Sequence, residues 1–164
     1  MSHPYDILDV PGGAGQLIFT PCPGSKGTSV DEALATLQAA GADALITLMP
    51  AEELARNEAT QLAQLCAERG LEWFHLPVAD EQVPLADFDQ AWEQSADRIN
   101  EMLDAGKRIA IHCKGGSGRT GLIAARILID RDVPRATAVA SVQALRPKAI
   151  QHPAHAGWIE RFGA

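Results

Sequence analysis

A glycine-rich segment in the last third of the chain joins a predicted strand to a predicted helix. The run before it, Arg108–His112, is short and contains β-branched residues, as a buried strand should. Apolar residues at helical spacing begin near Arg119 and continue to about Asp130. Because three of the four residues 115–118 are glycine, the backbone between strand and helix can turn tightly. The sequence therefore predicts a strand, a curled loop and a helix in succession.

Strand-like runs alternate with helical patterns along the rest of the chain, which is typical of an α/β fold with a largely parallel sheet. The predicted strands are Gln16–Thr20, Ala44–Met49, Glu72–Leu76 and Arg108–His112. The predicted helices run from Ser29 to Gly41, from about Glu58 to Arg69, from near Asp87 to Gly106, from Arg119 to about Asp130, from Pro134 to Arg146, and through a short final segment with Trp158, Ile159 and Phe162. We expect one domain, residues 1–164, with a central, mostly parallel, twisted sheet flanked by helices.

Composition and charge exclude several classes of protein. The formal net charge of −7 argues against a nucleic-acid partner. No apolar run reaches the roughly 18 residues of a membrane-spanning helix, and the first residues do not resemble a secretory signal. Three widely spaced cysteines do not suggest a disulfide framework. We expect a monomer in a reduced, cytoplasmic setting, without a membrane partner.

The curled loop has the composition of an anion-binding site. Inward-pointing amides and the N-terminus of the next helix favour an oxyanion, and the planar guanidinium of Arg119 can hold two of its oxygens. The residues predicted to surround a phosphate are Lys114, Gly115, Gly116, Ser117, Gly118 and Arg119. Cys113 lies at the bottom of this loop. In such surroundings the pKa of a cysteine falls from about 8.5 to roughly 3.5–7.5, so that a thiolate can attack phosphorus.

Two neighbours of the cysteine are assigned supporting roles. The Thr120 hydroxyl is expected to hydrogen-bond the sulfur and help it leave in a second step. His112, at the end of a buried strand, is expected to order the loop and not to transfer protons. Cys22 and Cys66 are interpreted as buried, inert thiols. Either could form a disulfide with Cys113 only if the Cα atoms lie within about 7 Å.

Other binding motifs fit less well. A nucleotide-binding Walker loop needs Gly where Cys113 stands and Lys where Arg119 stands. His152 and His155 are three residues apart, but no cluster of cysteine, histidine or acidic residues accompanies them. The sequence therefore predicts no metal site.

The segment from Cys113 to Arg119, followed by Thr120 and preceded by His112, resembles the Cys-x5-Arg signature of the protein tyrosine phosphatase superfamily. The small size of the chain and the late position of the loop are similar to those of dual-specificity phosphatases. The resemblance implies their fold and a phosphocysteine mechanism without metal or organic cofactor. It also implies a phosphorylated protein as substrate, with phosphotyrosine and phosphoserine or phosphothreonine both accepted.

Within that group, the closest resemblance is to the kinase-associated phosphatase family. Residues 22–26, Cys-Pro-Gly-Ser-Lys, resemble its Leu-Pro-Gly-Cys-Lys turn. Residues 77–80, Pro-Val-Ala-Asp, resemble its Pro-Ile-Ala-Asp, and residues 149–151, Ala-Ile-Gln, match its Ala-Ile-Gln. The three segments occur in the same order at similar spacing.

This resemblance implies that Asp80 is the general acid and that Gln151 orients the attacking water. The chemistry needs an acid because the leaving oxygen must be protonated as its bond to phosphorus breaks. A solvated loop aspartate is the alternative interpretation of Asp80, and Glu81 and Asp87 are the reserve candidates. Arg146 either organises the site or caps the end of its helix.

Three further functions are compatible with parts of the sequence. The loop resembles Cys-Lys-x-Gly-x-Gly-Arg-Thr-Gly of the tensin-homologue lipid phosphatases, which suggests a phosphoinositide substrate. Ser117 replaces their second lysine, however, and the chain is acidic. The second is a phosphoprotein-binding module without turnover, and the third is a rhodanese-like sulfurtransferase. The complete set of Cys113, Arg119 and Thr120 argues against the binding module.

Overall fold

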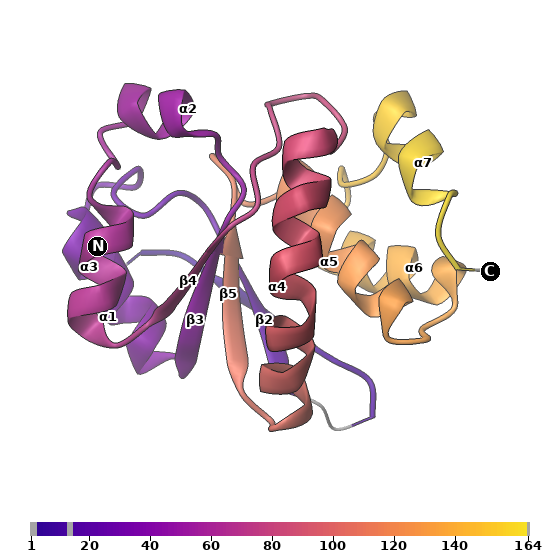
Figure 1. Ribbon diagram of the computed structural model, residues 1–164, viewed down its shortest axis with the longest axis horizontal. Coiled ribbons are helices and arrows are strands. Elements are labelled where there is room, and N and C mark those ends of the chain that lie inside the picture. The colour runs from indigo at the N-terminus through magenta and orange to yellow at the C-terminus, as the bar shows by residue number, and fades with distance from the viewer. Residues whose placement is uncertain (1–2, 13–14, 164) are drawn as a thin grey trace.

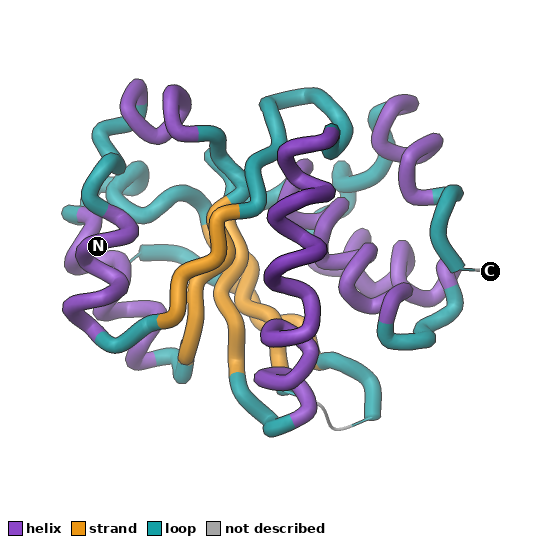
Figure 2. The backbone as a smooth tube through the Cα atoms, in the orientation of Figure 1, coloured by secondary structure: helices purple, strands orange, loops and turns teal. Residues whose placement is uncertain are grey.

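The computed structural model describes residues 3–12 and 15–163, and its centre is a five-stranded sheet (Figure 1, Figure 2). The strands are β1 (Asp6–Asp9), β2 (Gln16–Thr20), β3 (Ala42–Thr47), β4 (Glu72–His75) and β5 (Arg108–His112). Their order across the sheet is β1-β2-β5-β3-β4. β1 pairs antiparallel with β2, and the other neighbouring pairs are parallel. The predicted α/β fold with a mostly parallel sheet is confirmed.

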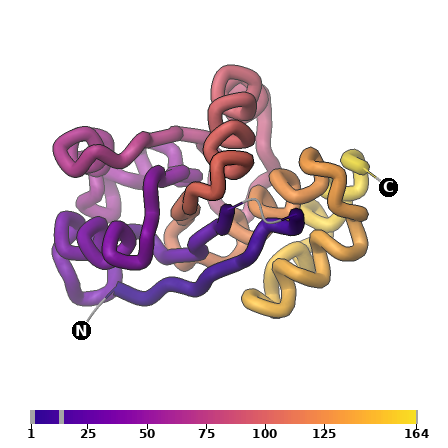
Figure 3. Tube along the Cα trace, turned by 90° about the horizontal axis from the view of Figure 1, so that it is seen from below, coloured from indigo at the N-terminus to yellow at the C-terminus, as the bar shows by residue number. Residues whose placement is uncertain are grey.

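Helices cover both faces of the sheet. They are α1 (Val30–Ala39), α2 (Ala51–Arg56), α3 (Leu62–Arg69), α4 (Ala86–Asp104), α5 (Gly118–Asp130), α6 (Arg135–Leu145) and α7 (Pro153–Ile159). In Figure 1, α1 and α3 lie to the left of the sheet and α4 to α7 lie to the right. The view from below in Figure 3 keeps the purple helices and the orange and yellow helices at opposite ends of the molecule.

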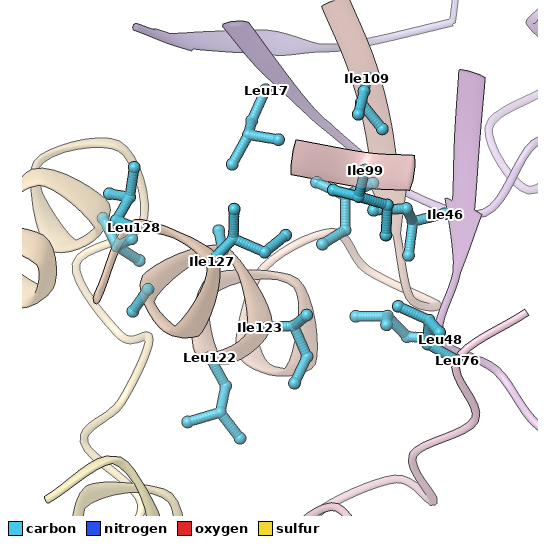
Figure 4. Close-up of a cluster of buried hydrophobic side chains, with 14 of the residues drawn as sticks. Leu17, Ile46, Leu48, Leu76, Ile99, Ile109, Leu122, Ile123, Ile127 and Leu128 are labelled. Atoms are coloured by element: carbon cyan, nitrogen blue, oxygen red, sulfur yellow. The ribbon is translucent and has the colours of Figure 1, made fainter. Parts of the chain in front are cut away.

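Side chains of the central strands alternate between two hydrophobic clusters, one on each face. In β2, Leu17 and Phe19 belong to the cluster that packs against α4 to α7, whereas Ile18 belongs to the cluster of α1 to α3. This period of two is what a strand buried on both faces produces. Figure 4 shows the larger cluster, in which strand residues meet α4 and α5 through Leu17, Ile46, Ile109, Ile99, Ile123 and Ile127.

Local sequence signals explain where several helices begin and end. Ser29 caps α1 by accepting a hydrogen bond from the Glu32 amide, and the Glu32 carboxylate accepts one from the Ser29 amide in return. Gly70 ends α3 in a left-handed conformation with φ +75°. One face of α4 is apolar and buried through Phe88, Trp92, Ile99, Met102 and Leu103. The predictions for α1 and α4, and for the end of α3, are confirmed within a few residues.

Other predictions differ from the structure. The helix expected from about Glu58 starts only at Leu62, because Glu58 has φ +57° and cannot continue a right-handed helix. The six-residue helix α2 is not predicted, since its turn and a half carries too few apolar residues to show a period. β1, an antiparallel edge strand of four mostly exposed residues, is not predicted either. Phe162 lies beyond the end of α7, although its ring packs edge-on against Trp158.

The parallel strands β2, β3, β4 and β5 end at the same edge of the sheet. The loops that follow them therefore meet at that edge, where ligands bind in open α/β sheets. Figure 1 places α2 and the loop between β4 and α4 together above this edge. No helix in the described ranges is long and apolar enough to cross a lipid bilayer.

Candidate active site

The glycine-rich loop is held between the loops that follow its two neighbouring strands. The amide of Cys22, just after β2, donates to the Lys114 carbonyl at 2.9 Å. The amide of Leu48, just after β3, donates to the His112 carbonyl at 3.0 Å. The loop is therefore fixed on both sides before α5 begins at Gly118.

Cys113 lies at the centre of this loop with its sulfur held by two donors. The Gly116 amide lies 3.3 Å from Sγ and the Thr120 hydroxyl lies 3.2 Å from it. Gly116 has φ +77°, and a Cβ atom there would lie only 2.6 Å from the carbonyl carbon of Thr20. The tight curl around the sulfur therefore requires glycine at this position.

Arg146 fixes the outer side of the same loop. Its Nε donates to the Gly116 carbonyl at 2.9 Å, and its Nη1 contacts Asp6 of β1 at 2.8 Å and the Leu145 carbonyl at 3.1 Å. Arg146 therefore both organises the loop and caps the end of α6. Because carbonyl and amide point in opposite directions across a planar peptide, holding the Gly116 carbonyl outward turns the Ser117 amide inward.

The curled backbone leaves several amides without a partner. In the described ranges, the N–H groups of residues 114, 115 and 117–119 donate to no backbone or side-chain acceptor. The last of these belong to the first turn of α5, whose N–H groups have no acceptor within the helix. An anion with several oxygens matches this set of donors.

A pocket of about 350 Å³ opens over the loop. Its lining residues are Ser25, Lys26, Asp80, Cys113, Lys114, Gly115, Ser117, Gly118 and Arg119. The structure thus brings most of the predicted site residues together, with Asp80 on a different loop from Cys113. Gly116, Thr120 and His112 lie buried behind the pocket wall. Ser25 and Lys26 are not among the predicted site residues, although they belong to the turn that carries the family resemblance.

The structure does not bring Gln151 to the pocket wall. Its side chain is exposed and donates to the Pro147 carbonyl at 2.6 Å. It follows Ile150, which has φ +62°, an unusual conformation for a β-branched residue. The role of Gln151 remains a prediction.

Glu53, at the end of the first turn of α2, is absent from the predicted site residues and is buried against Arg119. Glu53 Oε1 and Oε2 each lie 2.8 Å from the guanidinium, and Arg119 Nη1 also donates to the Val78 carbonyl at 2.9 Å. Asp80 Oδ1 lies 3.5 Å from Arg119 Nη2. Burial by itself lowers the pKa of Arg119, but the bonds to Glu53 and the nearby acidic groups raise it above its usual value. Glu53 lies six residues after the end of β3, and nothing in the sequence distinguishes it from its neighbour Glu52.

His112 belongs to a buried hydrogen-bonded chain that reaches the loop. Trp73 Nε1 donates to the Thr47 hydroxyl at 2.8 Å, the hydroxyl lies 2.8 Å from His112 Nε2, and His112 Nδ1 lies 3.0 Å from the Cys113 carbonyl. Because the carbonyl can only accept, Nδ1 carries the proton and Nε2 accepts from Thr47. Burial lowers the pKa of His112 to about 4, although the bond to the Cys113 carbonyl opposes this shift. A neutral ring thus fits the network.

The two other cysteines, Cys22 and Cys66, are buried thiols. All three cysteines are free, and Cys22 and Cys66 pack in the cluster on the opposite face from Cys113. Burial raises the pKa of Cys22 to about 12 and that of Cys66 to about 11. Within the part of the chain that the structure describes, no three His, Cys, Asp or Glu side chains are placed to hold a metal ion.

Solved structures share this fold over nearly the whole chain. Kinase associated phosphatase, with a serine in place of its catalytic-site cysteine, aligns with a TM-score of 0.86 and 21% identity over 98% of this chain and 94% of its own. A putative protein tyrosine phosphatase from Leishmania major aligns with a TM-score of 0.73 and 19% identity over 98% and 99%. The active form of Tk-PTP aligns with a TM-score of 0.68 and 24% identity over 94% of each chain.

The comparison with curated protein sequences finds no match. The comparison with protein-family models does find one. The family Tc-R-P, described as a polymorphic toxin system DSP-PTPase phosphatase, matches residues 23–132. That range is more than half of the chain and contains Glu53, Asp80 and the whole loop from Cys113 to Arg119. The chain therefore belongs to this DSP-PTPase family and is a cysteine-dependent phosphatase of the dual-specificity type.

Proposed function

We propose that the protein hydrolyses phosphate esters on proteins, both phosphotyrosine and phosphoserine or phosphothreonine, through a phosphocysteine formed on Cys113. One observation carries this proposal. The Cys113 sulfur accepts hydrogen bonds from Gly116 and Thr120 at the base of a pocket whose amides have no other acceptor in the described chain. A thiolate and a phosphoryl group are both stabilised by such donors, so nucleophile and substrate share one site.

The arrangement of Arg119 supports its role in binding phosphate. Glu53 occupies the end of the guanidinium, with one oxygen on each terminal nitrogen. The other edge of the guanidinium consists of the Nε N–H and the second N–H of Nη2. Nε donates to no described residue. Nη2 also lies 3.5 Å from Asp80 Oδ1, on the side of the pocket. We infer that this edge holds two phosphate oxygens while Glu53 keeps the group oriented.

In the first step, the Cys113 thiolate forms a bond to phosphorus as the ester P–O bond breaks. The electron pair of that bond goes to the leaving oxygen, which takes a proton from Asp80. The side chain of Asp80 is 68% exposed at the pocket mouth, so a bound substrate can reach it directly. The loop amides and Arg119 stabilise the charge on the equatorial oxygens.

In the second step, water attacks the phosphocysteine and gives its proton to Asp80. The sulfur leaves as a thiolate, which the Thr120 hydroxyl stabilises at its 3.2 Å position. Gln151 orients the water once its amide turns away from the Pro147 carbonyl. Inorganic phosphate is released and the thiolate is regenerated. No step needs a metal or an organic cofactor.

A phosphoinositide is the second candidate substrate, favoured by the two lysines of the pocket. Lys26 and Lys114 both line it, are exposed, and form no ion pair with another described residue. Two free cations beside the phosphate loop suit a substrate with more than one phosphate. The net charge of −7 opposes binding to an anionic membrane surface, which favours the protein substrate.

The test compares aryl phosphate, phosphopeptides and a soluble phosphoinositide with wild type, Cys113→Ser and Asp80→Asn. We expect near-complete loss of every activity in Cys113→Ser. Loss in Asp80→Asn should be large for poor leaving groups and small for good ones, because a good leaving group needs less protonation. Full activity in Cys113→Ser would refute the mechanism. Faster hydrolysis of the phosphoinositide than of every phosphopeptide would favour the second candidate.

A further inference from the structure

The loop that carries Asp80 makes a strained turn at the mouth of the pocket. Residues 79–82 are all exposed, and the Gln82 amide donates to the Ala79 carbonyl at 3.0 Å. Asp80 and Glu81 are the two central residues of this turn. Glu81 has φ +61°, a left-handed conformation that is unfavourable for a residue with a side chain. Contacts outside the turn must therefore hold it in this shape.

The two ends of the loop are fixed by neighbouring elements. At its start, the Val78 amide donates to the Leu48 carbonyl at 2.8 Å and the Val78 carbonyl accepts from Arg119. At its end, Val83 packs against the larger core cluster and Pro84 is buried. Between these two anchors the four residues of the turn are exposed.

Helix α7 supplies a contact to the middle of this loop. His155 is 4% exposed, and its Nε2 lies 2.8 Å from the Gln82 carbonyl. Because a carbonyl only accepts, Nε2 is the protonated nitrogen and donates. In the described part of the chain, no other side chain from outside the loop forms a hydrogen bond to the backbone of residues 79–83.

The same face of α7 also packs on the helix that follows the loop. Trp158 lies one turn after His155, so both side chains point the same way. Its ring meets Phe88 of the first turn of α4 edge-on, with centroids 6.3 Å apart. α7 therefore contacts the chain on both sides of the acid-bearing loop. In Figure 1 this loop and α7 lie at the same upper edge of the molecule.

We propose that His155 is a positioning residue for Asp80: its hydrogen bond to the Gln82 carbonyl holds the turn so that the Asp80 carboxyl faces the pocket. The inference rests on the proposed role of Asp80 as general acid. Without the bond, the strained turn relaxes and the carboxyl is aimed at the leaving oxygen for a smaller fraction of the time. His155 does not touch the substrate, so its effect must pass through protonation of the leaving group.

The experiment measures kcat/KM for a series of aryl phosphates that range from poor to good leaving groups. His155→Leu removes the Nε2 donor and replaces the ring with an apolar side chain that can stay buried. Because a hydrogen bond contributes about 0.5–1.5 kcal/mol, we expect a loss of up to about tenfold for phenyl phosphate and little loss for p-nitrophenyl phosphate. His155→Gln, whose amide can reach the same carbonyl, should recover most of the lost rate. His152→Ala, which removes the N-cap of α7 but keeps His155, is the matched control and should leave the leaving-group dependence unchanged.

A second comparison separates positioning of Asp80 from a general contribution of His155 to the stability of the fold. In the Asp80→Asn background, His155→Leu should add no further leaving-group dependence, because the acid that it positions is already absent. If His155→Leu does not fold, His155→Asn replaces it, since its shorter amide stays polar but does not reach Gln82. The rate of hydrogen exchange at the Gln82 amide, which donates to the Ala79 carbonyl, should also rise in His155→Leu and stay at the wild-type rate in His152→Ala.

The outcomes distinguish the two proposals. Equal losses for all leaving groups, or an unchanged rate of exchange at the Gln82 amide, would overturn the positioning role of His155 alone. If the loss of rate in Asp80→Asn relative to wild type is the same for poor and good leaving groups, Asp80 is not the general acid. The positioning role of His155 then fails with that assignment.

Discussion

The carboxylate of Glu53 lies end-on against the guanidinium of Arg119, with both oxygens at 2.8 Å and side-chain exposures of only 7% and 3%. Removing one partner of a buried ion pair leaves the other charge without compensation, which typically lowers stability by about 3–5 kcal/mol. We expect Glu53→Ala to lose stability of this order in urea unfolding and to weaken binding of vanadate, a phosphate analogue. Glu53→Gln, which keeps the shape and one acceptor, should lose less.

The adjacent residue provides a control for this prediction. Glu52 belongs to the same turn of α2 but is exposed. Glu52→Ala should change the free energy of unfolding by no more than about 0.5 kcal/mol, as is usual for surface substitutions. Equal stability of Glu53→Ala and Glu52→Ala would show that the buried pair does not hold Arg119.

Thr120 provides a test of how the sulfur leaves in the second step. A hydrogen bond to a charged group contributes about 1.5–3 kcal/mol, so Thr120→Val should slow phosphocysteine hydrolysis by roughly ten- to a hundredfold. Thr120→Ser keeps the hydroxyl and should remain within a few-fold of wild type. Rapid-mixing kinetics measure the difference, since the valine variant should show a burst of leaving group followed by slow turnover. A valine variant as fast as the serine variant would contradict the role of the hydroxyl.

Arg146 should affect phosphate binding through the loop that it holds. Its bond to the Gly116 carbonyl turns the Ser117 amide toward the pocket, so Arg146→Ala should weaken vanadate inhibition by about tenfold. Asp6→Asn removes the charge of the exposed partner at 2.8 Å and leaves the bond to Gly116 intact. Inhibition titrations should therefore separate the two variants. Equal loss in both would mean that the ion pair with Asp6, and not the bond to the loop, is what matters.

His112 predicts a specific dependence of stability on pH. Its pKa is about 4 in the folded protein, because of burial, and 6.5 in the unfolded chain. Between pH 4 and pH 6.5 the unfolded chain binds a proton on His112 that the folded protein does not bind. The contribution of the neutral His112 ring to the free energy of unfolding is therefore complete above pH 6.5 and is lost as the pH falls to 4. At about 1.4 kcal/mol per pKa unit, the loss is of the order of 3 kcal/mol.

The measurement compares urea unfolding of wild type and His112→Asn between pH 7 and pH 4. The variant lacks the titrating ring, whereas His3 and His155 titrate in both proteins. We expect stability to fall more steeply with decreasing pH in wild type than in His112→Asn. Parallel curves would show that the ring does not have to be neutral in the folded state.

Much of the fold is visible in the sequence because its signals are local. The strand Arg108–His112 is predicted with its correct bounds, and the capping box of Ser29 and Glu32 marks the start of α1. The loop from Cys113 to Arg119 can be recognised because glycines, cysteine and arginine stand at a fixed spacing. β1 cannot be found in this way, since a four-residue edge strand is defined by its partner β2 and not by its own pattern.

The parts of the site that the sequence does not reveal depend on contacts between distant segments. Glu53 and Arg119 are 66 residues apart, and no local pattern marks an acid that will be buried against a guanidinium. In the sequence, His155 stands out only as a possible metal ligand beside His152, whereas its partner is a backbone carbonyl 73 residues away. A backbone carbonyl has no sequence signature, so such a contact appears only once the chain is folded.

The central claim is that phosphate is transferred to the sulfur of Cys113, and trapping this intermediate tests it most directly. A rapid acid quench of wild type with excess substrate, followed by peptide mass spectrometry, should find one phosphoryl group on the peptide that contains Cys113. Asp80→Asn, which slows the second step, should accumulate more of it when the leaving group is good, and Cys113→Ser should not turn over. Turnover without any phosphorylated Cys113, or phosphate on a different residue, would contradict the account.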